Sequence, residues 1–196
     1  MSAAVLSRPL VSYAVPEKGI ARYAMLTFIA VVGTLLLTLS AKTKVVLGPV
    51  DMNLQTMVVP LLAAAFGLRL GVATVLLYLA QGAMGFPVFQ STPEKGIGIV
   101  YMLGTTGGFL AGFVLMAAIV GWAADRGWDR SALKLFGAML AGEVVVMAMG
   151  FAWLATLIGA SNAWQFGVAP FIVTDLVKIA LAAAIVPAVW SLFKRA

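Results

Sequence analysis

The sequence predicts an all-α integral membrane protein with six transmembrane helices and with both termini on the cytoplasmic side. The first observation is composition, because 63% of the 196 residues are hydrophobic and only 10% are charged. Soluble domains are close to half apolar and a quarter charged. The second observation is a series of six apolar stretches separated by polar loops. The third is a concentration of basic residues in alternate loops, which is a feature of oriented membrane proteins.

Each apolar stretch is interpreted as one span, because a helix needs about 20 residues to cross the hydrocarbon core. The spans are expected at residues 22–41, 53–68, 70–85, 99–122, 133–158 and 170–193. The second and third are short and meet around Arg69, so one bent segment is the alternative. Residues 1–20 are interpreted as a cytoplasmic tail and 21–196 as a single six-helix membrane domain. An uncleaved first span is favoured over a signal peptide, because the run 23–41 is long for one.

Loop charges predict the orientation of the spans. With the N-terminus inside, nine basic residues are cytoplasmic and three are external. The nine are Arg8, Lys18, Arg22, Arg69, Arg126, Arg130, Lys134, Lys194 and Arg195, and the three are Lys42, Lys44 and Lys95. Because cytoplasmic loops carry an excess of Lys and Arg, this ratio supports an N-in, C-in topology. The N-terminal end of the last span and the loops that hold Asp51, Lys95 and Asn162 would then face outward.

Small residues recur at four-residue spacing in two of the predicted spans. They are Ala30, Thr34 and Thr38 in the first span, and Gly104, Gly108 and Gly112 in the fourth. Such a spacing lets two helices approach closely, so helix packing is the favoured interpretation of both stripes. A phosphate-binding loop is rejected for the glycines, because no Gly-Lys-Ser/Thr element accompanies them.

The residue inventory excludes several classes of function. The chain has no Cys and no His, which removes thiol chemistry, the usual soft-metal ligands and the commonest general base. No nucleophile paired with a base is visible, so neither enzyme activity nor a cofactor is expected. The net charge of +6 is ascribed to the flanks of the spans, and no nucleic acid partner is expected.

Two ionisable residues, Asp175 and Lys178, lie inside the last apolar stretch. Charges in the bilayer core are costly, so such residues usually face a partner or a cavity. A spacing of three residues places both on one face of a helix. They form either a buried ion pair that holds the helix to its neighbours, or a recognition site for a ligand with an amide-like edge and an acid.

Three further polar residues have two interpretations each. The amides of Asn53 and Gln55, at the outward start of the second span, suit a neutral polar head group. The alternative is that Asn53 caps the helix and Gln55 lies on the surface. Glu143, in the fifth span, is either a snorkelling residue at the membrane interface or part of a proton relay.

Five segments of the chain, in order and at their spacing, resemble the signatures of one family. They are LGPVDMNLQT at 47–56, GAMGFPVF at 82–89, TPEKGIG at 92–98, LGTTGGFLAGF at 103–113 and PFIVTDLVKIALA at 170–182. They are similar to those of the BioY family, the biotin-binding substrate-specific (S) components of energy-coupling factor (ECF) transporters. The resemblance runs from about residue 23 to residue 193, and it implies a six-helix S-component bundle with the vitamin site near the outer face.

The resemblance implies a biotin site. Its candidate residues are Asp175, Lys178, Gln55, Asn53, Lys95, Tyr101, Phe89, Gly107 and Gly108. Asp175 is expected to accept from the ureido N–H groups, while Lys178 or Lys95 pairs with the carboxylate. Gln55 and the backbone of the two glycines would complete the polar contacts, with Tyr101 and Phe89 walling the thiophane ring.

The resemblance also implies partners and a location. A transmembrane coupling subunit and paired ATPases would supply the energy, in the plasma membrane, with the small-residue face of the first span as the expected docking surface. An ion-coupled carrier for a small carboxylate, with Glu143 or Asp175 as the coupling acid, is the nearest alternative. A membrane assembly factor is a second alternative, and an intramembrane enzyme is the least supported by the residues present.

Overall fold

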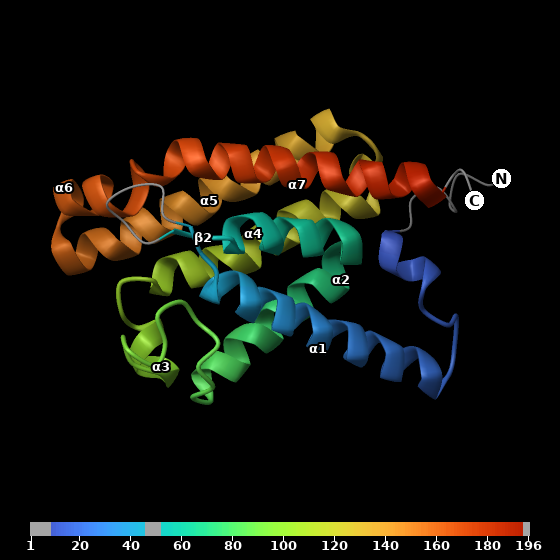
Figure 1. Ribbon diagram of the computed structural model, residues 1–196, viewed down its shortest axis with the longest axis horizontal. Helices are drawn as coiled ribbons and strands as arrows, with labels where there is room; N and C mark the ends of the chain where they lie inside the picture. Colours follow the sequence, from blue (N-terminus) through green and yellow to red (C-terminus); the bar gives the residue numbers. More distant parts are fainter. Residues whose placement is uncertain (1–8, 46–51, 194–196) are drawn as a thin grey trace.

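The computed structural model describes residues 9–45 and 52–193, which form a bundle of long helices with short turns at its ends (Figure 1). The long helices are α1 (Ile20–Lys42), α2 (Gln55–Ala83), α4 (Gly107–Asp125), α5 (Ala132–Ile158) and α7 (Phe171–Phe193). The short elements are η2 (Leu10–Tyr13), β1 (Lys44–Val45), β2 (Met52–Asn53), α3 (Gly98–Met102), η3 (Trp128–Arg130), α6 (Ala160–Ala163) and η4 (Trp164–Val168). Arg8, Asp51, Lys194 and Arg195, which were used in the predicted topology, lie outside the described residues.

Within the described ranges, five helical runs are long and apolar enough to cross a membrane, and α2 is one of them. However, α2 doubles back on itself. Gln55 Nε2 donates to Tyr78 Oη at 2.8 Å, although 23 residues separate them. A Cβ atom on Gly71 would lie 3.1 Å from the Cα of Ala63. Both contacts require antiparallel arms, so α2 is a hairpin, and its two arms correspond to the short spans predicted at 53–68 and 70–85 (Figure 1).

Gly67 permits this reversal of the chain. Its φ of +77° lies in the left-handed region, where glycine carries no penalty for a side chain. Asp125, at the end of α4, accepts a hydrogen bond from the backbone N–H of Leu68 at 3.2 Å. That carboxylate caps the second arm, since the first N–H groups of a helix have no partner within it. The turn thereby returns Tyr78 to the level of Gln55, where the site lies.

The glycine stripe of the fourth predicted span brings α4 against α5. A Cβ on Gly112 would lie 2.8 Å from the Cα of Val146, and one on Gly108 would overlap the carbonyl of Met149. The packing interpretation is therefore confirmed for these two glycines. Gly104 differs, because it lies in a turn before α4 and its carbonyl accepts a hydrogen bond from Trp153 Nε1 at 2.8 Å.

The predicted start of the fourth span, at residue 99, is wrong by about two helical turns. The chain first forms the short helix α3 and then a turn at 103–106, and α4 begins only at Gly107. Hydropathy alone did not reveal this turn. Ile99 and Val100 of α3 are apolar, so they were counted as part of the span, although the structure leaves them exposed.

The small-residue face of α1 is buried inside the bundle. Ala30 is 8% exposed and Thr34 is 1% exposed. A Cβ on Gly33 would lie 2.7 Å from the methyl group of Thr74 in the second arm of α2. The prediction that this face docks a partner is therefore wrong, because its small side chains are used to bring α1 close to α2. The opposite face of α1 is apolar and exposed, at Leu35 and Leu39 among others.

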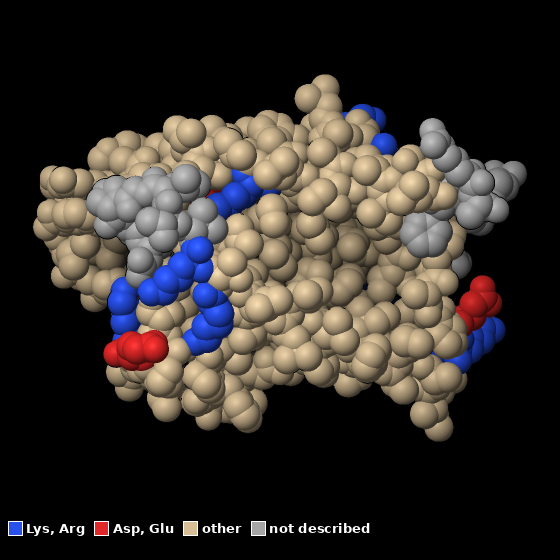
Figure 2. All heavy atoms as spheres, in the orientation of Figure 1, with Lys and Arg blue, Asp and Glu red and all other residues tan. Residues whose placement is uncertain are grey.

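Charged residues are divided between the two ends of the bundle. Lys42, Lys44 and Lys95 gather at the end that holds α3 and α6 (Figure 2). The other end of the bundle, close to the Gly67 turn, holds basic residues near helix termini, namely Arg69, Arg126, Arg130 and Lys134. This division agrees with the charges of the predicted loops. Which end of the bundle faces the cytoplasm stays a prediction.

The described part of the predicted tail contacts the membrane domain. The ring of Tyr13, in η2, lies edge-on to the ring of Trp190 in α7, with 5.5 Å between centroids. Trp190 Nε1 in turn donates to the fully buried carboxylate of Asp129 at 2.6 Å. Residues 10–13 therefore pack at the end of α7 that lies opposite the site described next.

Candidate functional site

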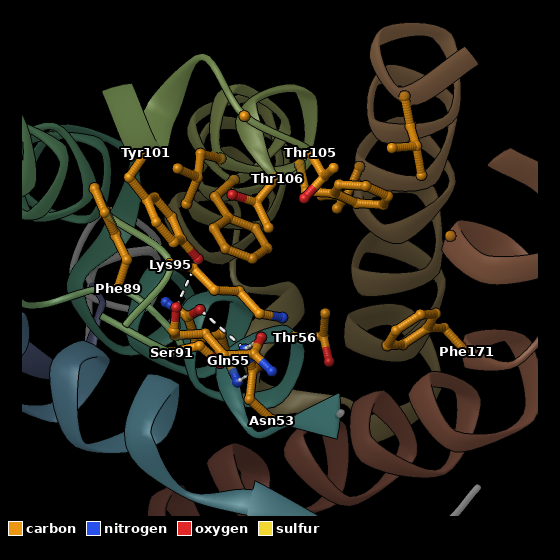
Figure 3. Close-up of a pocket in the computed structure, with 18 of the residues that line it drawn as sticks. Asn53, Gln55, Thr56, Phe89, Ser91, Lys95, Tyr101, Thr105, Thr106 and Phe171 are labelled. Atoms are coloured by element: carbon orange, nitrogen blue, oxygen red, sulfur yellow. Dashed lines mark hydrogen bonds between the residues drawn. The ribbon is translucent and has the colours of Figure 1, made fainter. Parts of the chain in front are cut away.

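A cavity of about 620 Å³ opens at the α3 end of the bundle, between α2, α4, α5 and α7 (Figure 3). This volume lies within the range of about 300–1,000 Å³ that small-molecule sites occupy. Six of the nine residues predicted for the site line it: Asp175, Gln55, Asn53, Lys95, Tyr101 and Phe89. The fold thus brings together residues from β2, α2, the 84–97 loop, α3 and α7, although they are spread over 120 positions.

The three other predicted residues do not line the cavity. Lys178 lies behind Asp175 and touches it directly. Gly107 and Gly108 are turned towards α5, and a Cβ on Gly107 would lie 3.0 Å from Trp153 Nε1. The expectation that these two glycines offer their backbone to a ligand does not fit this geometry. The preceding Thr105 and Thr106 line the cavity in their place.

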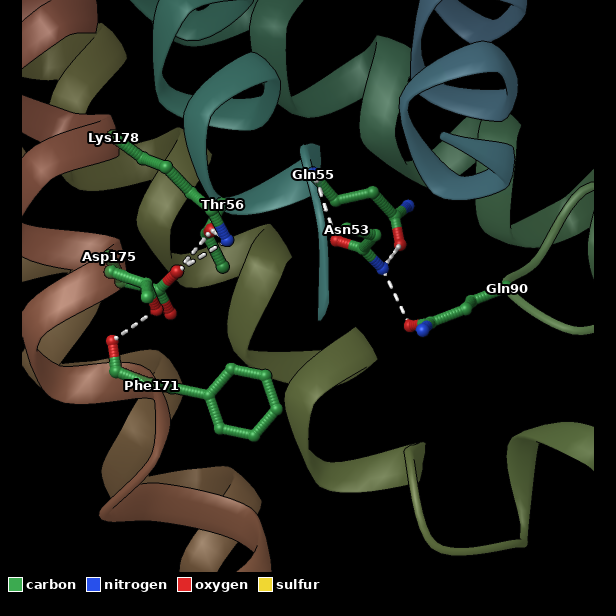
Figure 4. A network of polar contacts seen from close by, with 8 residues as sticks. Asn53, Gln55, Thr56, Gln90, Phe171, Asp175 and Lys178 are labelled. Atoms are coloured by element: carbon green, nitrogen blue, oxygen red, sulfur yellow. Dashed lines mark hydrogen bonds and ion pairs between the residues drawn. The ribbon is translucent and has the colours of Figure 1, made fainter. Parts of the chain in front are cut away.

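Asp175 contributes a carboxylate to the cavity wall (Figure 4). Its Oδ1 accepts from Lys178 Nζ at 2.8 Å and from Thr56 Oγ1 at 2.8 Å. Lys178 is on α7 like Asp175, whereas Thr56 is on α2, so the hydrogen bond from Thr56 ties α2 to α7. Oδ2 is buried and accepts no hydrogen bond from any residue that the structure describes. Both sequence interpretations of the pair therefore have a counterpart: Oδ1 is bound by Lys178 and Thr56, while Oδ2 has no N–H or hydroxyl donor among the described residues, in a residue that lines the cavity beside Glu143.

Side-chain amides form a second polar group across the cavity (Figure 4). Asn53 Nδ2 donates to Gln90 Oε1 at 2.7 Å and to Gln55 Oε1 at 3.2 Å. Asn53 Oδ1 accepts from the backbone N–H of Gln55 at 2.9 Å, which is the predicted capping contact at the start of α2. Gln55 is 3% exposed, so its interpretation as a surface residue is wrong. Asn53 combines the role of a cap with a place in the cavity wall.

Aromatic rings form the apolar wall of the cavity. The rings of Phe89 and Tyr101 are stacked with centroids 5.0 Å apart, and the ring of Tyr78 meets Phe89 edge-on at 5.3 Å. Tyr101 Oη donates to the carbonyl of Gln90 at 2.8 Å, which fixes the loop on α3. Gly82, in the second arm of α2, leaves the space that the Phe89 ring occupies.

Lys95 reaches the cavity from the loop before α3, and its side chain extends towards the centre of the site (Figure 3). Asp175 and Lys95 come from different elements that wall the same cavity. The site therefore offers a carboxylate acceptor and a cation, with amides and aromatic rings beside them. A ligand with N–H donors, a compact apolar body and an acid matches this set of groups.

Glu143 belongs to the same buried charge cluster. It lies near the middle of α5, is 6% exposed, and is in electrostatic contact with Asp175 and Lys178. Its carboxyl group lies against the Asp175 carboxyl group, and neither of its oxygens accepts from an N–H or hydroxyl group among the described residues. The interpretation as a snorkelling interface residue is wrong, because snorkelling requires an exposed head group. A role in proton transfer stays a prediction.

Several residues of the site were not predicted to be part of it. They include Thr56, Gln90, Thr105, Phe109 and Phe171, all of which line the cavity. Thr56 and Phe171 had a signal in the sequence, because each is next to or one helical turn from a predicted site residue. Phe109 follows the predicted Gly108 and belongs to the same quoted motif, but the space for its ring is left by Gly150 on α5, which the sequence did not indicate.

Comparisons with known proteins agree on one family. The model of the BioY family matches residues 16–195. The "Probable biotin transporter BioY" of Pyrococcus horikoshii is 37% identical over 76% of this chain and 86% of its own length. The "Biotin transporter BioY" of Thermotoga maritima is 35% identical over 78% of this chain and 88% of its own length.

A solved structure shares the fold. It is the crystal structure of the S-component for biotin from an ECF-type ABC transporter, with a TM-score of 0.72 and 19% sequence identity. The match covers 89% of this chain and 95% of the other. Fold and helix hydropathy together define a multi-pass membrane protein with the architecture of an S component. By the sequence matches, the chain belongs to the BioY family.

Proposed function

We propose that this protein binds biotin in the cavity and acts as the substrate-specific component of an ECF-type vitamin transporter in the plasma membrane. The assignment of the site depends on a single observation, which is that the two carboxylate oxygens of Asp175 have different surroundings. Its Oδ1 is bound by Lys178 and Thr56, while its Oδ2 is a buried acceptor without a partner among the described residues. Membership of a family whose named relatives are biotin transporters supports the choice of ligand.

Biotin has the groups that this cavity complements. Its ureido ring carries two N–H donors and a carbonyl, and Asp175 Oδ2 accepts from one of these donors. Across the cavity, Gln55 Nε2 has a second N–H besides the one it donates to Tyr78, and this N–H suits the ureido carbonyl, while Asn53 holds Gln55 and Gln90 in place. The stacked rings of Phe89 and Tyr101 wall the apolar thiophane ring. Lys95 pairs with the carboxylate, since Lys178 is already bound to Asp175.

The chain supplies binding and specificity, and energy for transport comes from partner subunits. No Gly-Lys-Ser/Thr element for nucleotide phosphates is present in the sequence. A transmembrane coupling subunit and paired ATPases are therefore the partners, and the loaded S component reorients in the membrane to release biotin inward. No resident cofactor takes part, and biotin is the substrate.

An ion-coupled carrier for a small carboxylate is the second candidate function, and one observation favours it. Glu143 lies buried against Asp175 and near Lys178, and no N–H or hydroxyl group of the described residues donates to it. Buried acids in contact with a substrate site are the groups that proton-coupled carriers use. Uptake driven by an ion gradient in the absence of ATPases is the result that separates this candidate from the first.

Equilibrium binding of radiolabelled biotin to the purified protein tests the proposal. We expect the wild-type protein to bind biotin, and Asp175→Asn to weaken binding by about 10- to 100-fold, because a hydrogen bond to a charged group contributes about 1.5–3 kcal/mol. Lys178→Ala weakens binding as well, because it releases the carboxylate that it positions. Lys134→Ala, at the start of α5, is the control. Unchanged affinity in both site variants would overturn the assignment.

A further inference from the structure

A second cavity, of about 430 Å³, adjoins the biotin cavity at the same end of the bundle. Ser91 and Lys95 line both cavities, so the two spaces meet at this loop. The remaining wall of the second cavity comes from the end of α1, from β1 and from the loop before α3. We call this space the lysine vestibule, because Lys42, Lys44 and Lys95 line it.

The lysine vestibule carries a net positive charge. Among the described residues of its wall, three lysines stand against one acid, Glu94, and all four side chains are exposed. Figure 2 shows this group of basic side chains on an otherwise mostly uncharged surface. The lysines are held in place by the fold. Lys42 Nζ donates to Thr92 Oγ1 at 2.9 Å, and Lys44 is paired across the β1–β2 ladder with Asn53, which lines the biotin cavity.

The inner wall of the biotin cavity, as far as the structure describes it, has no such surplus of positive charge. Asp175 lines that cavity, and the buried cluster behind it contains two carboxyl groups, Asp175 and Glu143, and one ammonium, Lys178. A ligand carboxylate is therefore attracted towards the lysines and finds no unpaired cation among the described residues of the inner wall. Charges of one sign along a cleft with low-dielectric walls focus the electric field and raise the association rate of an oppositely charged ligand.

We propose that the lysine vestibule is the entrance subsite for the carboxylate of the ligand, where Lys42 and Lys44 speed association and Lys95 receives the acid once the ureido ring has entered. This inference rests on the proposed function, because it assigns a role to charges beside the same site. It assigns different roles to the lysines: Lys42 and Lys44 attract the approaching ligand, and Lys95 pairs with the carboxylate of the bound ligand. The ligand class is a small monocarboxylate with a neutral polar head.

Association and dissociation rates of tritiated biotin and of neutral biotinamide, measured in an uncharged detergent, test this role. Removing both charges in Lys42→Gln/Lys44→Gln should lower the association rate of biotin about 5- to 10-fold at low salt, within the range that electrostatic steering supplies. The dissociation rate should stay within about twofold, and the difference should vanish near 0.5 M salt, because ions screen exposed charges. Biotinamide should associate equally fast with both proteins.

Two further variants make the test specific. Lys134→Gln removes an exposed charge at the opposite end of the bundle and should leave all rates unchanged. Lys44→Gln alone leaves the Lys42–Thr92 contact intact, and it should retain a clear, salt-dependent loss in the association rate. An unchanged association rate at low salt, or equal slowing of biotinamide, would overturn the vestibule. Absence of biotin binding to the wild-type protein would overturn the proposed function as well, whereas tight binding without salt dependence would overturn the vestibule alone.

Discussion

At the scale of single residues, the two oxygens of Asp175 have different surroundings. A buried carboxylate is costly unless it is paired, and Lys178 and Thr56 satisfy only Oδ1. Oδ2 is left as an acceptor that a ligand N–H can satisfy. The ion pair at Oδ1 is therefore compatible with the proposed ligand contact at Oδ2. The pair orients the carboxylate before the ligand arrives, which reduces the entropy lost on binding.

Substitutions at the Asp175–Lys178 pair should affect the stability of the protein and its affinity for biotin differently. Lys178→Met leaves the Asp175 carboxylate buried without its cation, so we expect a loss of about 3 kcal/mol in unfolding free energy. Adding Asp175→Asn to the same chain removes the unpaired charge and should recover most of this stability. Biotin binding should not recover, because the charged acceptor is absent. Thermal unfolding and a biotin titration on each variant check this, and recovered binding in the double variant would contradict it.

Lys95 should act on the acid of the ligand and on nothing else. Lys95→Gln removes the cation in the cavity, so biotin should dissociate faster and bind about tenfold more weakly, as expected for the loss of a partly exposed charge pair. Biotinamide, which has no negative charge, serves as the internal control and should bind both proteins equally. Isothermal titration with the two ligands makes the comparison, and equal weakening of both would assign Lys95 to the loop structure instead.

At the scale of helices, glycines on one element decide where an aromatic ring on another can lie. Gly82 on α2 makes room for Phe89, and Gly150 on α5 makes room for Phe109. Both rings line the biotin cavity. Helix packing and the shape of the site are therefore set by the same contacts. A methyl group at either glycine would push a ring, because packed interiors have little free space.

Gly150→Ala tests this coupling against Gly137→Ala in the same helix. An alanine Cβ at 150 would overlap the Phe109 ring, whereas nothing lies within 4 Å of a Cβ at 137. We expect Gly150→Ala to lower stability by about 1–3 kcal/mol and biotin affinity several-fold, because the ring must move. Gly137→Ala should raise stability by up to about 1 kcal/mol and leave binding unchanged. Similar binding curves for both variants would show that the Phe109 position is not limiting.

At the scale of the whole molecule, the two ends of the bundle carry different groups. One end holds the cavity and the lysine vestibule. The other holds the Gly67 turn, the η3 loop and the contact of η2 with Trp190. The cavity lies at one end of the bundle, so release of a ligand on the other side of the membrane requires that the whole S component reorient or that the helices separate.

Reconstitution in proteoliposomes tests whether this chain moves biotin by itself. We expect the protein alone to bind biotin without accumulating it, with or without an ion gradient, and to accumulate it when the coupling subunit and ATPases are present with ATP. Gradient-driven uptake without ATPases would instead support the ion-coupled carrier. In that case Glu143→Gln should abolish uptake, because it removes the titratable group of the buried cluster.

Hydropathy and charge, which are local properties of the chain, were enough to predict the membrane class, the hairpin arms of α2, the end of the bundle that holds the site, and Asp175 as part of it. Which face of a helix meets which neighbour depends on contacts between residues that are distant in the sequence. Only the tertiary structure decided these contacts. It turned Gly107 and Gly108 towards α5, buried the small-residue face of α1 against α2, and placed Glu143 beside Asp175. Residue spacing reports the faces of a helix, but close packing of side chains selects the face that each neighbour covers.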